Sequence, residues 1–128
     1  MIRVLIFSLF ATSCSSQIQI TDHIDLGRPL NLTINTLDKE TGLTTVKQSE
    51  IMPQSEKYEK FIDWCRDNDT GWSASFESFN SKASVSQNNF RFLLLTNGVV
   101  VGFTDKNGNQ KQFTKTTNTD DLAFLTNE

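Results

Sequence analysis

The chain has little of the chemistry on which enzymes and metalloproteins rely. It holds one histidine and two cysteines in 128 residues, and no cluster of Cys and His at zinc-ligand spacing. Nucleophilic catalysis needs a base beside the nucleophile, but the single histidine, His23, lies between Asp22 and Asp25 near the N-terminus. We expect His23 to be an exposed residue of a tether rather than a pH switch or a ligand. The sequence therefore assigns no catalytic residue, no metal and no cofactor, and it predicts a protein that is not an enzyme.

Basic clusters and long apolar runs are also missing. The net charge is -3, and no group of Lys and Arg is available to neutralise phosphates, which argues against nucleic-acid binding. The apolar run at residues 4–11 is interrupted only by Ser8 and follows Arg3. It is too short for a membrane-spanning helix, which needs about 20 apolar residues. Residues 1–13 instead fit an export signal peptide.

The end of this run carries a short motif. It resembles the lipobox of bacterial lipoprotein precursors in four residues: Ala11, Thr12, Ser13 and Cys14. In that family the Cys is lipidated and becomes the mature N-terminus, and Ser15 in the next place resembles the signal for outer-membrane delivery. The resemblance implies a protein held by a lipid anchor on the periplasmic side of the outer membrane.

Two alternatives to lipidation stay open. The same small residues satisfy the rule of an ordinary signal peptidase, which predicts a soluble periplasmic or secreted protein. The segment also fits a buried N-terminal strand. If Cys14 is unmodified, it can form a disulfide with Cys65 in an oxidising compartment. The domain organisation expected under lipidation is a signal peptide at 1–13, a lipidated Cys and tether at 14–27, and one globular domain at 28–128.

Residues 90–103 predict a central β-hairpin. Asn97-Gly98 lies between two runs of apolar and β-branched residues and favours a two-residue type I′ turn. That turn would pair Phe92 with Phe103 and Leu94 with Val101. Both faces of the hairpin are apolar, so we expect it to be covered on both sides.

One strong helix is predicted over about 55–67, after Pro53. Ser55 can cap it, and Trp64 at the edge of the apolar stripe is expected to lie over the seam between helix and sheet. Cys65 is expected to be a buried, inert thiol. The apolar face that docks on the sheet comprises Tyr58, Phe61, Ile62 and Cys65.

Further strands follow from alternation of apolar and polar residues. A first hairpin, with Leu30 and Leu32 half-buried and Val46 inward, is expected at a sheet edge. Other strands are expected at 72–77, 83–87 and 111–117, and Thr119 can cap a short C-terminal helix. The sum is an α+β fold, an antiparallel sheet of about six strands with one main helix on one face.

Two acidic stretches, at 67–71 and 105–109, mimic calcium loops but lack the full ligand pattern, which favours turns. The least favoured function is a small carboxylate-dependent hydrolase. Its acids would come from Asp67, Asp69, Glu77 and Asp105.

Three elements together are similar to small bacterial lipoproteins of the immunity or inhibitor type. They are the Tyr-x-x-Phe-Ile-x-Trp helix, an aromatic strand, and the hairpin that begins at Asn97-Gly98. The resemblance implies a protein partner, either a toxin or a cell-wall hydrolase, and a monomeric inhibitor. The surface we expect to bind it is the loop after the helix, with Asp67, Asp69 and Trp72. The alternative is a structural or assembly lipoprotein of the envelope, which can form a homodimer.

Overall fold

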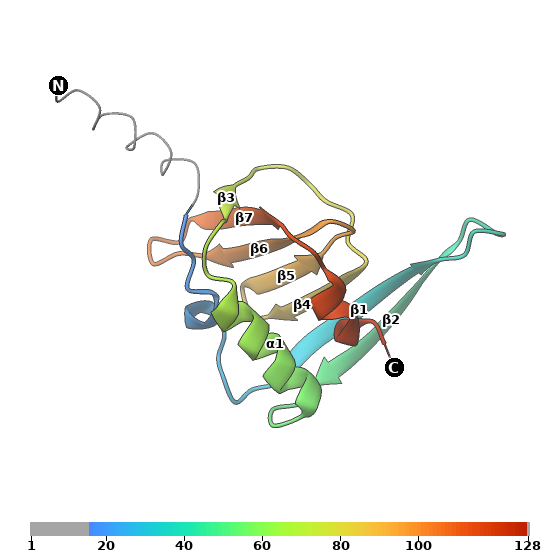
Figure 1. The fold of residues 1–128 in the computed structure, drawn as a ribbon, viewed down its shortest axis with the longest axis horizontal. Coiled ribbons are helices and arrows are strands. Elements are labelled where there is room, and N and C mark those ends of the chain that lie inside the picture. Colours follow the sequence, from blue (N-terminus) through green and yellow to red (C-terminus); the bar gives the residue numbers. More distant parts are fainter. Residues whose placement is uncertain (1–15, 128) are drawn as a thin grey trace, which may run out of the picture.

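The computed structural model describes residues 16–127, which form one antiparallel sheet with helix α1 across one face (Figure 1). The strand order is β2-β1-β4-β5-β6-β7-β3. The strands are β1 (Leu30–Leu37), β2 (Thr44–Ile51), β3 (Ser73–Ala74), β4 (Ala83–Gln87), β5 (Phe90–Leu94), β6 (Gly98–Thr104) and β7 (Gln110–Thr116). The helices are α1 (Glu56–Asp67) and the 3-10 helices η2 (Ile20–His23) and η3 (Asp120–Leu125). The predicted α+β fold is confirmed, with seven strands rather than about six.

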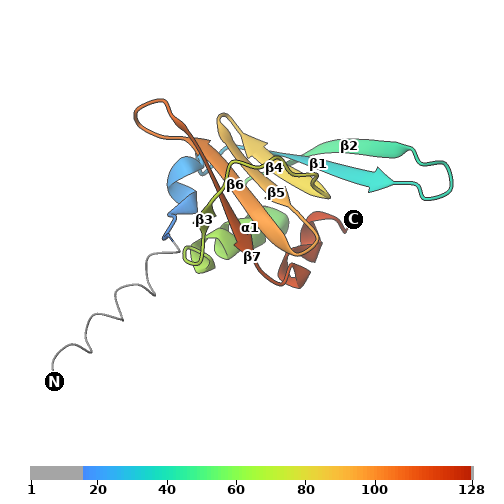
Figure 2. The ribbon, with the colours of Figure 1, turned by 90° about the horizontal axis from the view of Figure 1, so that it is seen from above.

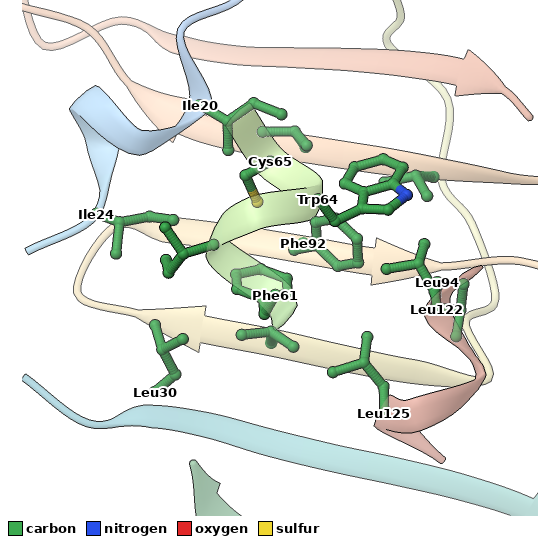
Figure 3. Packing of buried hydrophobic residues seen from close by; sticks show 14 of the residues in the cluster. Ile20, Ile24, Leu30, Phe61, Trp64, Cys65, Phe92, Leu94, Leu122 and Leu125 are labelled. Atoms are coloured by element: carbon green, nitrogen blue, oxygen red, sulfur yellow. The ribbon is translucent and has the colours of Figure 1, made fainter. Parts of the chain in front are cut away.

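Helix α1 begins and packs as its sequence predicts. The Ser55 hydroxyl accepts a hydrogen bond from the Tyr58 backbone amide at 3.1 Å, which satisfies one of the free N–H groups of the first turn. The buried side chains of the helix are Tyr58, Phe61, Ile62, Trp64 and Cys65. Their apolar surface meets the strands β4 to β6 in the core shown in Figure 3. Trp64 contacts Phe92 edge to face, with ring centroids 5.5 Å apart, as expected of a ring over the helix-sheet seam.

The central hairpin forms, but its turn lies one residue before the predicted position, so the pairing of the two strands is shifted by two residues. Phe92 pairs with Val101 and Leu94 with Val99, and the Leu95 amide donates to the Gly98 carbonyl at 2.9 Å. The turn therefore centres on Thr96 and Asn97. A shift of two preserves the faces, so Phe92, Leu94, Val99 and Val101 still point to the core.

The segment at 16–27 is not the loose tether that the sequence suggested. Ile18, Ile20 and Ile24 are all buried, and the Ile18 amide donates to the Asp69 carbonyl at 2.7 Å. The apolar surface of the three isoleucines and an antiparallel bridge between Ser16 and Trp72 hold this irregular segment on the domain. The predicted signal peptide and Cys14 lie outside the described residues.

The structure confirms some of the remaining predictions about strands and caps and corrects others. Strand β2 lies at the edge of the sheet as expected, but Val46 is 56% exposed and does not point inward. Phe113 pairs with Val101, which places it on the core side. The Thr119 side chain does not cap η3; the Asn118 side-chain oxygen instead accepts from the Asp120 amide at 2.9 Å.

A long connection crosses the sheet face opposite α1, which we call the outer face. Strands β3 and β4 are consecutive in the chain, yet three strands, β5, β6 and β7, separate them in the sheet. Residues 75–82, which we call the strap, bridge this gap (Figure 2). Val100, on the outer face, is fully buried, so the central hairpin is covered on both sides as predicted. The predicted strand at 72–77 is wrong beyond Ala74, because the chain leaves the sheet there.

Candidate functional site

The hairpin of β1 and β2 extends beyond the rest of the sheet as an arm (Figures 1 and 2). Strand β4 pairs with β1 only from Asn31 to Ile34, so the outer part of the hairpin has no further strand beside it. We define the arm as residues 36–45. Within and next to the arm, three aliphatic side chains are exposed to solvent: Leu37 (60%), Leu43 (67%) and Val46 (56%). Exposed aliphatic groups gathered at one projection mark a protein-interaction site more often than isolated surface residues do.

The tip of the arm is held in one shape by its own backbone. The Asp38 amide donates to the Leu43 carbonyl at 2.8 Å, and the Asp38 carbonyl accepts from the Gly42 amide at 2.8 Å. The Asp38 carboxylate also accepts from the Glu40 amide at 2.9 Å. Gly42 has a φ of 73°, a conformation that glycine adopts without steric cost. The arm is therefore preorganised, and a partner that binds it has little chain entropy to overcome.

A groove on the outer face is the second candidate site. It has a volume of about 510 Å³ and lies between the strap and the strands β5, β6 and β7. Phe76 on the strap is 97% exposed at its border, although the sequence placed this residue in a strand. Phe79 lines this groove and also a neighbouring hollow of about 400 Å³. The strap thus carries one exposed and one half-buried phenyl ring across the outer face.

The loop predicted to bind a partner is largely engaged by the fold itself. Trp72 is fully buried, and its indole N–H donates to the Asn68 carbonyl at 2.7 Å. The Asp69 carboxylate accepts from the Gln17 side-chain amide at 3.1 Å, while Asp67 stays exposed at the end of α1. Trp72 therefore has no surface for a partner, because the segment at 16–18 and Lys115 cover this region. Binding through the two Asp residues stays a prediction.

The acids of the hydrolase hypothesis lie on separate elements. Asp67 is the last residue of α1, Asp69 follows the helix, Glu77 is on the strap, and Asp105 is in the β6–β7 turn. The Asp105 carboxylate accepts from the amides of Asn107 and Asn109, both at 2.9 Å, as expected of a turn residue. Within residues 16–127, no three or more His, Cys, Asp or Glu side chains gather closely enough to hold a metal ion.

Two further titratable residues have perturbed environments. Burial raises the pKa of the Cys65 thiol far above its usual range, which fits the predicted inert thiol, and Cys65 is a free cysteine. His23 is not exposed on a tether as expected. Its ring stacks on Phe103 with centroids 3.6 Å apart and 13° between the ring planes. Desolvation lowers the pKa of His23, and the Asp22 carboxylate partly offsets this effect.

Neither candidate site was predicted from the sequence, although each has a recognisable sequence feature. In the arm, Leu37 and Leu43 flank the polar turn at 38–42. They do not continue the alternation of apolar and polar residues that a core strand shows. The strap is marked by the glycine-free stretch at 77–82 between Phe76 and Ala83, which is polar except for Phe79.

Comparisons of the chain with protein-family models, with characterised proteins and with solved structures find no match. In the part of the chain that the structure describes, no helix is long and apolar enough to cross a membrane.

Proposed function

We propose that this protein is a non-enzymatic binding protein of the bacterial cell envelope, anchored through a lipid on Cys14, that uses its arm to bind a protein partner. The observation that supports the proposal is the exposure of Leu37, Leu43 and Val46 on a preorganised hairpin. Burying apolar surface yields about 25 cal/mol per Å², so three aliphatic side chains entering a cleft supply a useful part of a binding energy.

The shape of the arm favours an immunity or inhibitor function. A narrow two-stranded projection with an apolar tip can enter the cleft of a toxin or a cell-wall hydrolase and exclude its substrate. Leu37 and Val46 lie on the same face of the hairpin, since Leu37 pairs with Thr44 and Asn35 with Val46. Leu43 lies at the turn, directly before Thr44. The partner surface that fits this arrangement is a hydrophobic pocket that contacts one face of the hairpin.

A structural or assembly function is the second candidate, and the free edge of β2 favours it. Strand β2 is the outermost strand of the sheet, and seven of its eight residues are exposed. An edge strand of this length can pair with a second chain through its backbone. Lys47 and Glu50 on this strand are the kind of charged residues that discourage such pairing. Sedimentation at increasing protein concentration separates this function from that of a monomeric inhibitor.

The test of the binding proposal is site-specific photo-crosslinking in cells of the source organism. A photoreactive residue replaces Leu43 on the arm, and in the control it replaces Lys57 on α1, far from the arm in the chain. We expect a discrete crosslinked partner from position 43 that disappears when Leu37→Ser and Val46→Thr are introduced together. A crosslinking pattern that is the same at both positions, or that survives both substitutions, would contradict the proposal.

The anchor has its own test. The variant Cys14→Ala cannot be lipidated, so we expect it to move from the membrane fraction to the soluble fraction. If the variant still fractionates with membranes, the lipoprotein assignment fails, whatever the arm binds.

A further inference from the structure

The groove on the outer face holds a fixed guanidinium group. Arg91 of β5, Gly102 of β6 and Gln112 of β7 are neighbours in one row across three strands. The Arg91 side chain lies over Gly102, where a Cβ atom would come within 2.9 Å of Arg91 Nε. Arg91 Nη2 donates to Gln112 Oε1 at 2.9 Å. Gly102 thus leaves the room in which the arginine lies along the sheet.

The same row ties the guanidinium to the strap. Gln112 Nε2 donates to the Glu77 carbonyl at 2.7 Å, and the Ser75 amide donates to the Gln112 carbonyl at 2.9 Å. Gln112 therefore bridges Arg91 to the wall of the groove. An arginine side chain has five N–H donors, and Arg91 uses one of them here. No ion pair of Arg91 is found among residues 16–127.

The surroundings of Arg91 combine positive charge with apolar surface. The charged residues that line the groove are Arg91, Lys111 and Glu77, which sum to one positive charge. Lys111 lies 3.9 Å from the Asp105 carboxylate, so its charge is partly balanced, whereas that of Arg91 is not. Leu93 and Phe79 are half-buried in the groove, and Phe76 is 97% exposed at its border.

We propose that this groove binds a ligand with a free carboxylate beside an apolar group. The two carboxylate oxygens would accept hydrogen bonds from the Arg91 fork, a geometry that a planar guanidinium matches. The apolar group would cover Leu93, Phe79 and Phe76. The volume of about 510 Å³ lies within the usual range of small-ligand sites. Two sources supply this chemistry, the C-terminal residue of a peptide and a fatty acid. The proposal does not depend on the function of the arm.

The experiment is an NMR titration of the full-length protein with two pairs of probes. The first pair is N-acetyl-alanyl-leucine and its C-terminal amide, and the second is decanoate and decanamide. We expect saturable shifts of the Gly102 and Gln112 backbone amides with at least one carboxylate, and binding at least about tenfold weaker for the matching amide. Binding of the peptide alone assigns a peptide C-terminus, binding of decanoate alone assigns a fatty acid, and binding of both assigns the shared chemistry.

Two variants test the role of the arginine. Arg91→Gln removes the charge from an exposed side chain and is expected to weaken carboxylate binding at least about tenfold. Gly102→Ala keeps the charge but displaces a flexible side chain, so it is expected to weaken binding while the circular dichroism spectrum stays unchanged. Arg66→Gln on α1 is the control and should bind as the parent does. The proposal is overturned if neither carboxylate saturates at about 10 mM, or if Arg91→Gln binds as tightly as Arg66→Gln.

Discussion

Gln87 is the one buried residue among 16–127 with a polar amide or charged side chain, and it holds a whole loop in place. Its side-chain oxygen accepts from the Asp25 amide at 2.6 Å, and its side-chain nitrogen donates to the Asp25 carbonyl at 3.0 Å. The same nitrogen lies 3.3 Å from the carbonyls of Arg28 and Pro29. Tyr58 supports this loop from the helix by donating its hydroxyl to the Arg28 carbonyl at 3.0 Å. One amide side chain thus replaces the backbone pairing that an irregular loop lacks.

Replacing Gln87 by Leu should therefore destabilise the protein. The substitution keeps a similar volume but leaves the Asp25 amide without its partner, which costs about 1–3 kcal/mol. Urea unfolding followed by tryptophan fluorescence measures the change. Gln110→Leu, at an exposed position of β7, is the matched control and should change stability little. Equal stability of both variants would mean that the loop does not depend on this clamp.

The lowered pKa of His23 predicts that the stability of the fold depends on pH. Its pKa in the folded state lies below the ordinary value of 6.5, so the folded state disfavours the proton relative to the unfolded chain. The contribution of His23 to stability is then fully present above about pH 6.5 and is lost as the pH falls from there toward the lower folded pKa.

We expect the urea midpoint to fall between about pH 7.5 and about pH 5.5, a window in which most carboxylates remain charged. The variant His23→Phe keeps an aromatic ring on Phe103 but cannot bind a proton, so its midpoint should change less over this window. An identical slope in both proteins would exclude His23 as the cause.

At the scale of elements, the helix was readable from the sequence because its signals are local. Ser55 and an apolar face repeating at helical spacing define α1 without reference to any other segment. The hairpin register was not readable in this way. Gly98 has no positive φ, and the close approach of β7 instead requires a glycine, because a Cβ atom there would lie 2.5 Å from the Lys115 carbonyl oxygen. The Thr117 amide, which donates to the Asn97 carbonyl at 3.1 Å, adds a distant contact to the turn.

The candidate sites were missed for a related reason. The alternation of apolar and polar residues in β1 indicates which side chains share a face. It does not indicate that the pairing with β4 ends at Ile34. Val46 is exposed because it pairs with Asn35 on the outer face, whereas Lys47 pairs with Ile34 on the core side, and this register is a property of the hairpin pairing. In the same way, the strap depends on where β3 and β4 lie in the sheet, and strand order is set by contacts distant in sequence.

We expect that the arm can be shortened without loss of the fold. Replacing residues 37–44 by Asn-Gly would join Thr36 to Thr45, which are paired in the structure, through a two-residue turn. The deleted side chains are exposed, so we expect the free energy of unfolding to change by less than about 1 kcal/mol. The crosslinked partner should be lost at the same time. Thermal unfolding checks the first expectation, and a marked loss of stability would show that the arm supports the core.

At the scale of the whole molecule, the reactivity of the Cys65 thiol can serve as a measure of global unfolding. Its thiol is 1% exposed beneath α1, among apolar side chains of the sheet and of the segment at 16–27 (Figure 3). In a Cys14→Ser variant it is the sole cysteine of the chain. We expect this thiol to react with an alkylating reagent only as fast as the protein unfolds, since burial both hides it and raises its pKa.

The measurement is the labelling rate at increasing urea concentration, compared with that of a Cys14→Ser, Ser49→Cys variant carrying a second thiol on exposed strand β2. Position 49 should react at once in the native state, while position 65 should follow the unfolding curve. Rapid labelling of Cys65 in the native protein would show that α1 separates from the sheet without global unfolding.

The topology also sets the order in which the molecule can fold. Strands β4 to β7, the third to sixth strands of the sheet, all come from residues 83–116. Helix α1 and the β1–β2 hairpin are synthesised earlier, but Phe61 and Leu32 find their partners Phe92 and Val85 only in the later part of the chain. A nascent chain that ends at residue 82 therefore has no sheet on which its helix can pack. The sheet is therefore complete only once the C-terminal third of the chain has been made, and the strap, which joins β3 to β4, crosses the sheet only when both of these strands are paired.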